Sequence, residues 1–490
     1  MTSSITFPTE LWMQILRLSS LEHSDYAVLC RVTKPLLPIA QPLLFSRMDI
    51  GVYPDLKAIR RRQLFFQTYI DNTKKRLDYF RVNWPTTVNS ISPVSKEFAY
   101  YELDKVDPQG IIYRQTCKEI IDTVFDRLNS FPNVRSLHID NFIIEQRYFS
   151  ALENLQLKDL TFYRCFFRGP RYGEDDEGYD EDYDSEDERD SSMDENAEDY
   201  VGDVLPSSDF HIKHLHRIVI VDNALSPCVS TWQGLIDPSS VEEIVTNRHF
   251  VPLLKVLRWV PLFPKLTTLL LPGARLRSGQ IDAFKDVFTK CPNLVHLKLD
   301  SFSGSGHDIP ITISPNTVPK LKYLTTDLRG ISSFLPTRPI ESIDLTDHLA
   351  FSDETAQSMM QISLDARQLR RLTVKYRVCP RDDHSMVLLA FDNLFTRFDA
   401  LEEFELTMTG SKPIFQHLIN KICDLIAGHE IHMRIRVFKY YSSRHLSRPG
   451  EHHQKSKHSS LDELHSTNKF ATYLKFCCPK LEVAVVEVED

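Results

Sequence analysis

Two eleven-residue stretches decide the fold: L-K-D-L-T-F-Y-R-C-F-F at Leu157–Phe167 and L-H-R-I-V-I-V-D-N-A-L at Leu215–Leu225. Each begins with an apolar residue that is followed by apolar residues three and five positions later. This alternation is typical of a short strand with one buried face. The ninth position is Cys165 in the first stretch and Asn223 in the second. We expect this small side chain to turn inward, and an asparagine there can bond backbone groups that otherwise lack partners.

The same spacing recurs along most of the chain. Degenerate copies begin at Val241 and Leu321, and a faint copy lies near Ile435 and Val437. From Leu215 to Leu401 the copies begin 19 to 32 residues apart, a period that indicates leucine-rich repeats. The complete copies are Leu77/Phe80/Val82, Val134/Leu137/Ile139, Leu157/Leu160/Phe162, Leu215/Ile218/Ile220, Leu266/Leu269/Leu271, Leu294/Leu297/Leu299, Ile340/Ile343/Leu345, Leu369/Leu372/Val374 and Leu401/Phe404/Leu406.

Segments with helical spacing precede several of these strands, at residues 120–128, 281–288 and 388–395. Several strands follow a Pro-x-Leu or Pro-x-Val junction, and proline ends a helix and favours an extended chain around it. The predicted unit is therefore a helix, a corner and a short parallel strand. Stacked units share one core and present a strand face to a protein partner. The predicted fold class is α/β, an irregular leucine-rich-repeat-like solenoid.

Composition and charge narrow the class of protein. The chain has 490 residues, a net charge of −9, 42% apolar and 26% charged residues, which is typical of a soluble globular protein. Its longest apolar run, residues 250–263, contains Lys255 and Arg258, and the N-terminus lacks the pattern of a secretion signal. The nine cysteines include no C-x-x-C pair. We expect reduced thiols and a cytoplasmic and/or nuclear location.

One segment carries most of the negative charge. Residues 174–199 hold sixteen acidic residues against Arg189, so that the local charge is −15 and the rest of the chain carries +6. Because the segment has almost no aliphatic residues, it cannot bury enough surface to offset its ordering entropy. The sequence predicts a disordered acidic insertion over residues 171–205.

The N-terminal segment departs from the repeat. F-P-T-E-L-W-M-Q-I-L-R-L, residues 7–18, starts a helix at Pro8, and a second helical stretch, Tyr26 to Leu37, contains A-V-L-C-R-V-T-K-P-L. This segment resembles an F-box, whose pattern opens L-P-x-E-[LI]-x-x-x-I-[LF]. Phe7 stands where the family has leucine, and Leu44-Phe45 where many members have L-W. With the repeats behind it, most of the chain resembles a fungal-type F-box/leucine-rich-repeat protein.

The resemblance implies the substrate-recognition subunit of a cullin-type (SCF) ubiquitin ligase. A three-helix F-box would dock a Skp-family adaptor, which joins a cullin and a RING subunit, while the repeats would hold an unknown target protein. Such a subunit is not an enzyme itself, because its contribution is proximity. By motif match, the adaptor-binding residues would be Phe7, Pro8, Leu11, Ile15, Leu16, Leu29 and Val32.

The domain boundaries follow from these patterns. We expect an F-box at residues 1–48, the first repeats at 49–170, the acidic insertion at 171–205, and the remaining repeats with a C-terminal cap at 206–490. An alternative stays open, in which the chain is a non-enzymatic leucine-rich-repeat scaffold whose N-terminal helices only cap the solenoid.

The sequence offers no catalytic constellation against this interpretation. Gly304-Ser305-Gly306 lacks the rest of a phosphate-binding loop, and His429 and His432 are three residues apart rather than the four of H-E-x-x-H. The positive balance outside the acidic insertion is too small to indicate nucleic-acid binding. We therefore expect no cofactor, no metal, no nucleic acid and no membrane partner.

A target would bind the residues that lie between the buried positions of each strand. They are mostly basic in the middle repeats and acidic at Glu402, Glu403 and Glu405, which predicts a partner with acidic character near the middle repeats. Two alternatives stay open: these are only solvated strand faces, or the acidic insertion competes for the same surface. The candidate target-binding residues are Arg135, His138, Arg217, His296, Lys298, Tyr323, Arg370, Arg371 and Lys375.

Overall fold

In a computed structural model the chain forms two compact units, unit 1 (Met1–Trp259) and unit 2 (Val260–Asp490). Their boundary lies inside the range 206–490 that the sequence assigns to one array. Apart from a few single positions, the structure describes residues 131–168, 210–221, 229–246, 250–275, 278–301, 313–335, 338–349, 368–378, 384–398, 400–410, 412–429, 434–443 and 478–489, with the strands 47–51 and 79–83 and isolated positions within 25–40, 122–129 and 472–476. The acidic insertion and most of the predicted F-box lie outside these residues.

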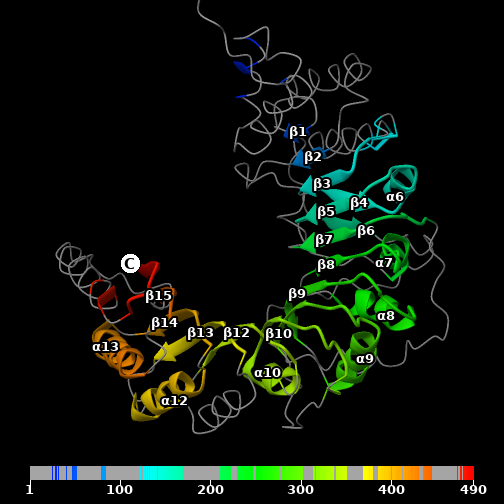
Figure 1. The fold of residues 1–490 in the computed structure, drawn as a ribbon. Coiled ribbons are helices and arrows are strands. Elements are labelled where there is room, and N and C mark those ends of the chain that lie inside the picture. The colour runs from blue at the N-terminus through cyan, green and yellow to red at the C-terminus, as the bar shows by residue number, and fades with distance from the viewer. Residues whose placement is uncertain are drawn as a thin grey trace, which may run out of the picture. The chain divides into compact units, whose positions relative to one another are not determined.

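Unit 1 is an α/β unit built on a parallel sheet in the order β1-β2-β3-β5-β7-β8. A separate pair, β4 and β6, is also parallel. Three described helices lie on one side of the strands (Figure 1). The elements are β1 (Arg47–Gly51), β2 (Tyr79–Asn83), β3 (Ser136–Asp140), β4 (Ile143–Glu145), α6 (Arg147–Leu152), β5 (Asp159–Tyr163), β6 (Phe166–Arg168), β7 (Arg217–Val221), α7 (Val229–Leu235), β8 (Glu243–Thr246) and α8 (Val251–Trp259).

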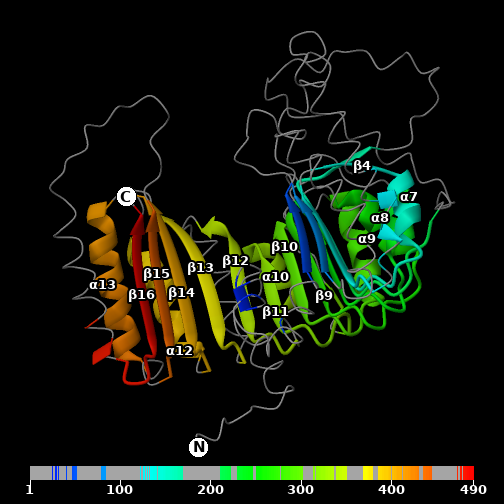
Figure 2. The ribbon, with the colours of Figure 1, turned by 90° about the horizontal axis from the view of Figure 1, so that it is seen from above.

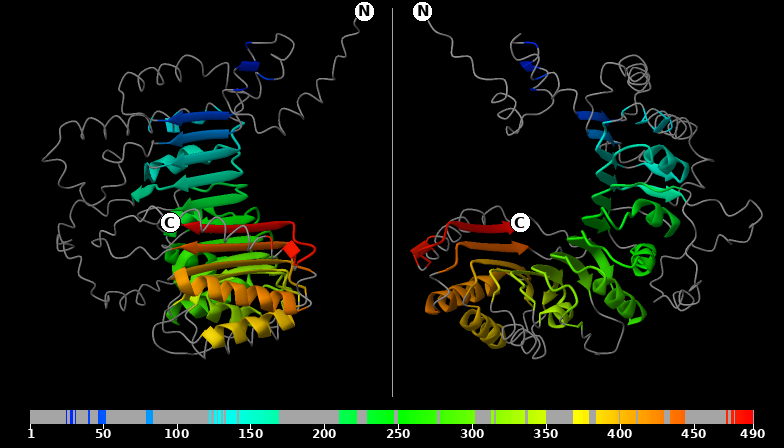
Figure 3. Two further views of the ribbon diagram at one scale, coloured as in Figure 1. Left: turned by 90° about the vertical axis from the view of Figure 1, so that its left-hand side faces the viewer. Right: turned by 45° about the vertical axis from the view of Figure 1, so that its right-hand side comes forward.

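Unit 2 repeats the same design, with parallel strands in the order in which they follow along the chain, β9 to β16. Figure 3 shows that these strands run in one direction. The elements are β9 (Thr268–Arg275), α9 (Ser278–Thr289), β10 (His296–Ser301), β11 (Tyr323–Thr326), α10 (Leu328–Phe334), β12 (Ser342–Leu349), β13 (Arg371–Val378), α12 (His384–Arg397), β14 (Glu403–Gly410), α13 (Lys412–Gly428), β15 (Val437–Ser443) and β16 (Val483–Glu489).

The burial of the repeat positions confirms the strand prediction. From Val134 to Leu406, every apolar residue of the complete copies has at most 2% of its surface exposed, and so do the degenerate pairs that begin at Val241 and Leu321. The predicted strand Leu77/Phe80/Val82 coincides with β2, although its side chains lie outside the described residues. Each strand therefore contributes the same apolar face to the core of its unit.

The corner before five of the strands is a tight turn with the same hydrogen bond. The backbone N–H of the first apolar residue donates to the carbonyl three residues earlier, at Val134, Leu294, Leu321, Leu401 and Leu481, with distances of 3.0–3.2 Å. The accepting residues are buried, so the corner also fills the core. They are Phe131, Cys291, Val318, Phe398 and Cys478.

The small-residue position behaves as the sequence predicts in the copy that can be tested. Cys165 is fully buried, and its thiol lies 3.5 Å from the carbonyl oxygen of Ile139 and 3.4 Å from that of Tyr163. The equivalent Asn223 lies outside the described residues.

Three details differ from the expectation. In the faint copy the buried partner of Ile435 is Phe438, three positions on, whereas Val437 is partly exposed. A further strand, β16, follows the Pro479-Lys480-Leu481 junction, in the range where the sequence predicts the C-terminal cap. Leu389 of α12, which fits the helical spacing, is 45% exposed. The sequence pattern thus places Val437 and Leu389 on the wrong side of their elements.

Candidate protein-binding surface

The face of the unit 2 sheet opposite its helices is the candidate binding surface, and we call it the open strand face. In Figure 2 α12 and α13 lie on one side of β13 to β15. On the other side, side chains of adjacent strands form rows fixed by the parallel register. One row consists of His296, Tyr323, Ser342, Arg371 and Glu403. The next consists of Lys298, Thr325, Asp344, Thr373 and Glu405.

An alternating row of charges runs along the N-terminal edge of this face. Each member directly follows the first apolar residue of a repeat, and each carbonyl along this edge accepts two consecutive N–H groups from the next repeat. Ion pairs join Lys322 to Glu341 at 2.8 Å, Glu402 to Arg370 and Arg436 at 3.7 and 3.6 Å, and Arg436 to Glu482 at 2.9 Å. We call Lys322, Glu341, Arg370, Glu402, Arg436 and Glu482 the edge ladder.

The ladder shifts the pKa values of its members in the direction that favours their charges. The hydrogen bond from Lys322 to Glu341 raises the lysine pKa. The hydrogen bonds between Arg436 and Glu482 raise the pKa of the guanidinium and lower that of the carboxyl group. These groups are fully exposed, so solvent screening limits what the pairs contribute to stability.

The predicted basic and acidic parts of the surface meet at β13 and β14 and neutralise each other there. Arg371 lies 3.8 Å from both Glu403 and Glu405, and Lys439 of β15 lies 3.5 Å from Glu405. Together with the Arg370–Glu402 pair, these contacts engage both predicted arginines with carboxylates of the same sheet. A charge reversal at either arginine would therefore disturb the sheet as well as any bound target.

The remaining predicted residues of unit 2 lie on β10, β11 and β13. His296 and Tyr323 occupy adjacent strands, and their rings are stacked with centroids 4.1 Å apart. Lys298 and Lys375 form no ion pair with other residues in the described part of the chain. The structure thus separates two arginines that are engaged with carboxylates from two lysines that are not.

The predicted residues of unit 1 also lie on or beside strands, and two of them have local partners. Arg135 donates to the side chain of Gln156 at 2.7 Å. Arg217 pairs with Glu243 on the neighbouring strand at 3.1 Å. His138 is half-buried on β3. The open strand face is defined on unit 2, and these three residues belong to unit 1.

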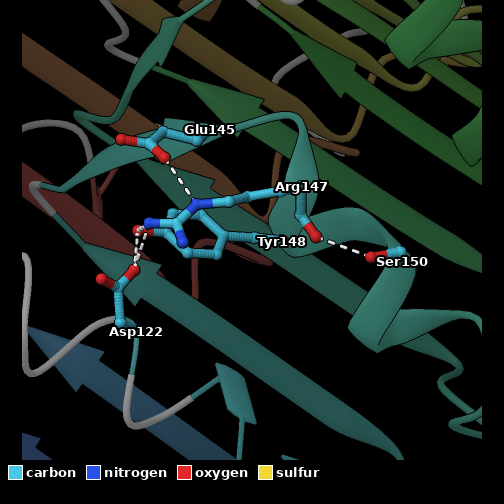
Figure 4. A network of polar contacts seen from close by, with 5 residues as sticks. All are labelled: Asp122, Glu145, Arg147, Tyr148 and Ser150. Atoms are coloured by element: carbon cyan, nitrogen blue, oxygen red, sulfur yellow. Dashed lines mark hydrogen bonds and ion pairs between the residues drawn. The ribbon is translucent and has the colours of Figure 1, made fainter.

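A polar cluster in unit 1 was not predicted from the sequence. Arg147 donates to Glu145 and to Asp122, both at 2.6 Å, and the Tyr148 hydroxyl donates to Asp122 at 2.5 Å (Figure 4). Burial and the Asp122 hydrogen bond raise the pKa of Tyr148, so the phenol keeps its proton. A cavity of about 300 Å³ lies beside these residues. The charges of this cluster already pair with one another. The cluster therefore links α6 to the preceding helical residues, and it is a weaker candidate for a ligand site than the open strand face.

The predicted adaptor-binding residues cannot be placed. Phe7, Pro8, Leu11, Ile15, Leu16 and Val32 lie outside the described residues. Leu29 is described as helical and half-buried, in agreement with the helix predicted over 26–37.

The described residues contain neither a metal-binding group of side chains nor a membrane-spanning helix. No three His, Cys, Asp or Glu side chains among the described residues are grouped so that they could hold a metal ion. None of the described helices is both long enough and apolar enough to cross a membrane. The fold itself defines an α/β protein with parallel strands added in chain order. No family model matches the chain, and no curated protein matches it.

Proposed function

We propose that this protein is the substrate-recognition subunit of a cullin-type ubiquitin ligase. In this proposal residues 1–48 form an F-box that docks a Skp-family adaptor, and the parallel strands belong to a leucine-rich-repeat solenoid that binds the target. The proposal rests on the open strand face, with its regular rows of side chains, which follows in the sequence an N-terminal segment that resembles an F-box. A strand face of this kind is a common platform for protein partners.

The protein would act without chemistry of its own. It would hold the target near the ubiquitin-carrying subunits of a cullin and RING core, and proximity alone would raise the rate of transfer. The adaptor groove would accept the apolar side of the first F-box helix, a helix-in-groove interface. This role places the protein in the cytoplasm, the nucleus or both.

The adaptor interaction is the first test of this proposal. We expect a purified Skp-family adaptor to bind the full chain, and the double variant Leu11→Asp/Ile15→Asp to weaken binding by about a hundredfold or more, because two carboxylates would be buried in an apolar groove. Isothermal titration calorimetry would measure both. Leu389→Asp is a matched control, since that leucine is 45% exposed on α12 and lies far along the sequence from the F-box segment. The control should bind like the natural chain.

The alternative makes the opposite prediction. If the chain is a scaffold whose N-terminal helices only cap the repeats, a well-folded natural chain will not bind the adaptor at micromolar concentrations. That result would leave the open strand face intact as a protein-binding surface and would remove the ligase assignment.

A further inference from the structure

We infer that the open strand face of unit 2 binds an acidic, extended segment of the target protein, with Lys298 and Lys375 as its anchoring cations and the His296–Tyr323 pair as its apolar contact. The inference rests on the proposed function, because it names the chemistry of the target that the receptor would hold. The charge and spacing of these four side chains carry it.

Among the described side chains of this face, two lysines have no carboxylate within ion-pair distance. Arg370, Arg371, Lys322 and Lys439 are each within 4.0 Å of a carboxylate of the same sheet. Lys298 and Lys375 have no such partner among the described residues. A bound carboxylate would therefore gain a charge-assisted contact there without breaking an existing pair.

The positions of the lysines fit an extended peptide. Lys298 is on β10 and Lys375 is on β13, and β11 and β12 lie between them. Lys375 lies two residues beyond Thr373, the β13 residue in the row of Lys298, so three strand spacings and this offset correspond to about 16 Å, which an extended chain covers in about five residues. A peptide that crosses the strands could thus present one carboxylate to each lysine.

An aromatic surface lies one row from Lys298. The ring planes of His296 and Tyr323 are inclined by only 9°, and Tyr323 is 40% exposed. Stacked rings offer a rigid apolar contact for a side chain between the two acidic residues. Among the described residues of 296–378, Tyr323 is the most exposed large apolar side chain.

Asp344 lies between the two lysines and opposes an acidic ligand. Burial raises the pKa of Asp344, while Lys375 and then Lys298 act to lower it. Its Oδ1 atom is buried and accepts no hydrogen bond in the described structure. The lysines act on Asp344 from beyond ion-pair distance, and removing this carboxylate should remove a charge that repels an acidic ligand. We therefore expect Asp344→Asn to tighten binding of an acidic ligand, whereas the lysine variants should weaken it.

The test uses the full chain and a fluorescein-labelled peptide of alternating glutamate and tyrosine residues, followed by fluorescence anisotropy at low salt. Lys298→Ala and Lys375→Ala should each weaken binding by about threefold to fivefold, and the double variant by about tenfold or more. Asp344→Asn should tighten it by about threefold. Lys285→Ala is the matched control, because this lysine lies on α9 and pairs with Asp282. The same peptide with glutamine in place of glutamate should bind much more weakly.

Each other outcome overturns a part of the inference. Equal binding by the lysine variants, or by the glutamine peptide, would remove the acidic-ligand assignment. If a peptide copying residues 174–199 competes with the probe and responds to the same variants, the occupant is the acidic insertion of this chain and the target assignment is wrong. Adaptor binding is measured separately, so loss of peptide binding with intact adaptor binding contradicts only this inference. Peptide binding without adaptor binding contradicts only the ligase proposal.

Discussion

Replacing Arg338 with methionine should lower the free energy of unfolding by about 3 to 5 kcal/mol, one of the largest effects expected from a single change in unit 2. The guanidinium group is 6% exposed and has backbone carbonyls as its partners. It donates to the carbonyl oxygens of Phe334 and Ser314, both at 2.6 Å, and of Thr317 at 3.0 Å. Methionine fills a similar volume but removes the arginine donors from the carbonyls of Phe334 and Thr317, whereas the Ser314 carbonyl still accepts from the Thr317 N–H at 2.9 Å.

The location of Arg338 explains why this one side chain contributes so much to the free energy of unfolding. Phe334 ends α10, where the last carbonyls of a helix lack partners, and Ser314 and Thr317 belong to the segment that leads into β11. A cation at the end of a helix is also favoured by the helix dipole. Burial lowers the pKa of Arg338 to about 10, so the group remains charged at neutral pH.

Urea denaturation of the full chain, with hydrogen exchange of the β11 and β12 amides as a local readout, would measure the effect. Arg338→Lys should recover only part of the lost stability, because an ammonium group cannot reach several carbonyls with a planar fork. Arg370→Met is the matched control: its side chain is 65% exposed, and its loss should cost at most about 1 kcal/mol. A change below about 1 kcal/mol in Arg338→Met would show that water satisfies these carbonyls equally well.

The repeat architecture could be predicted from the sequence because each copy is a local pattern. The apolar residues three and five positions after the first one point to the same side of a short strand because they are two residues apart, and the first one lies in the corner before the strand. The burial values follow that rule copy by copy. The pattern failed where residues of other types fill the same positions. Ile435 is followed by Phe438 rather than by a leucine, and Leu481 is followed by the small Ala484, so the spacing is harder to recognise at β15 and β16.

The edge ladder corresponds to a charge pattern that is visible in the sequence. The residue after the first apolar position is charged with alternating sign in six successive copies: Lys322, Glu341, Arg370, Glu402, Arg436 and Glu482. Aligning the copies on this column would have predicted both the ion pairs and the strand after Leu481. It would also have shown that Arg370 is neutralised within the sheet.

Other contacts could not be predicted from local patterns. Arg147 reaches Asp122 across 25 residues, and Arg338 reaches Ser314 across 24, so these bonds depend on how helices and loops settle against each other. Asp344 and the two lysines meet only because of the register of four strands. Sequence spacing identified the face on which they lie and left their pairing undetermined.

Gly330 sits at a close contact that the sequence does not reveal. It lies in the first turn of α10, where Asp327 caps the helix by accepting a hydrogen bond from its N–H at 2.7 Å. A methyl group on Gly330 would lie 2.2 Å from Oγ1 and 2.9 Å from Cγ2 of Thr326, and 3.1 Å from Oδ1 of Asp327. Thr326 is fully buried at the end of β11, so it cannot move away into solvent.

Gly330→Ala should therefore destabilise unit 2 by about 2 to 4 kcal/mol, through overpacking and loss of the cap. The structure also predicts a rescue. Since the Thr326 hydroxyl is buried and has no hydrogen-bond partner in the described structure, Thr326→Ala removes the clashing atoms without leaving a donor unpaired. The double variant should regain at least half of the loss, because the new methyl group occupies the space that the threonine side chain vacates.

A glycine in open space provides the control for this pair. No atom lies within 4 Å of a methyl group built on Gly428 at the end of α13, so Gly428→Ala should leave stability unchanged or raise it by up to about 1 kcal/mol. Thermal unfolding of the four variants would place Gly330→Ala well below the others. If Gly330→Ala were as stable as Gly428→Ala, or if Thr326→Ala failed to restore it, the tight contact between β11 and α10 would not be what sets the stability of this turn. If the destabilisation persists without the Thr326 side chain, loss of the helix cap at Asp327 is the remaining cause, and Asp327→Ala, which removes the accepting oxygen, tests the cap alone.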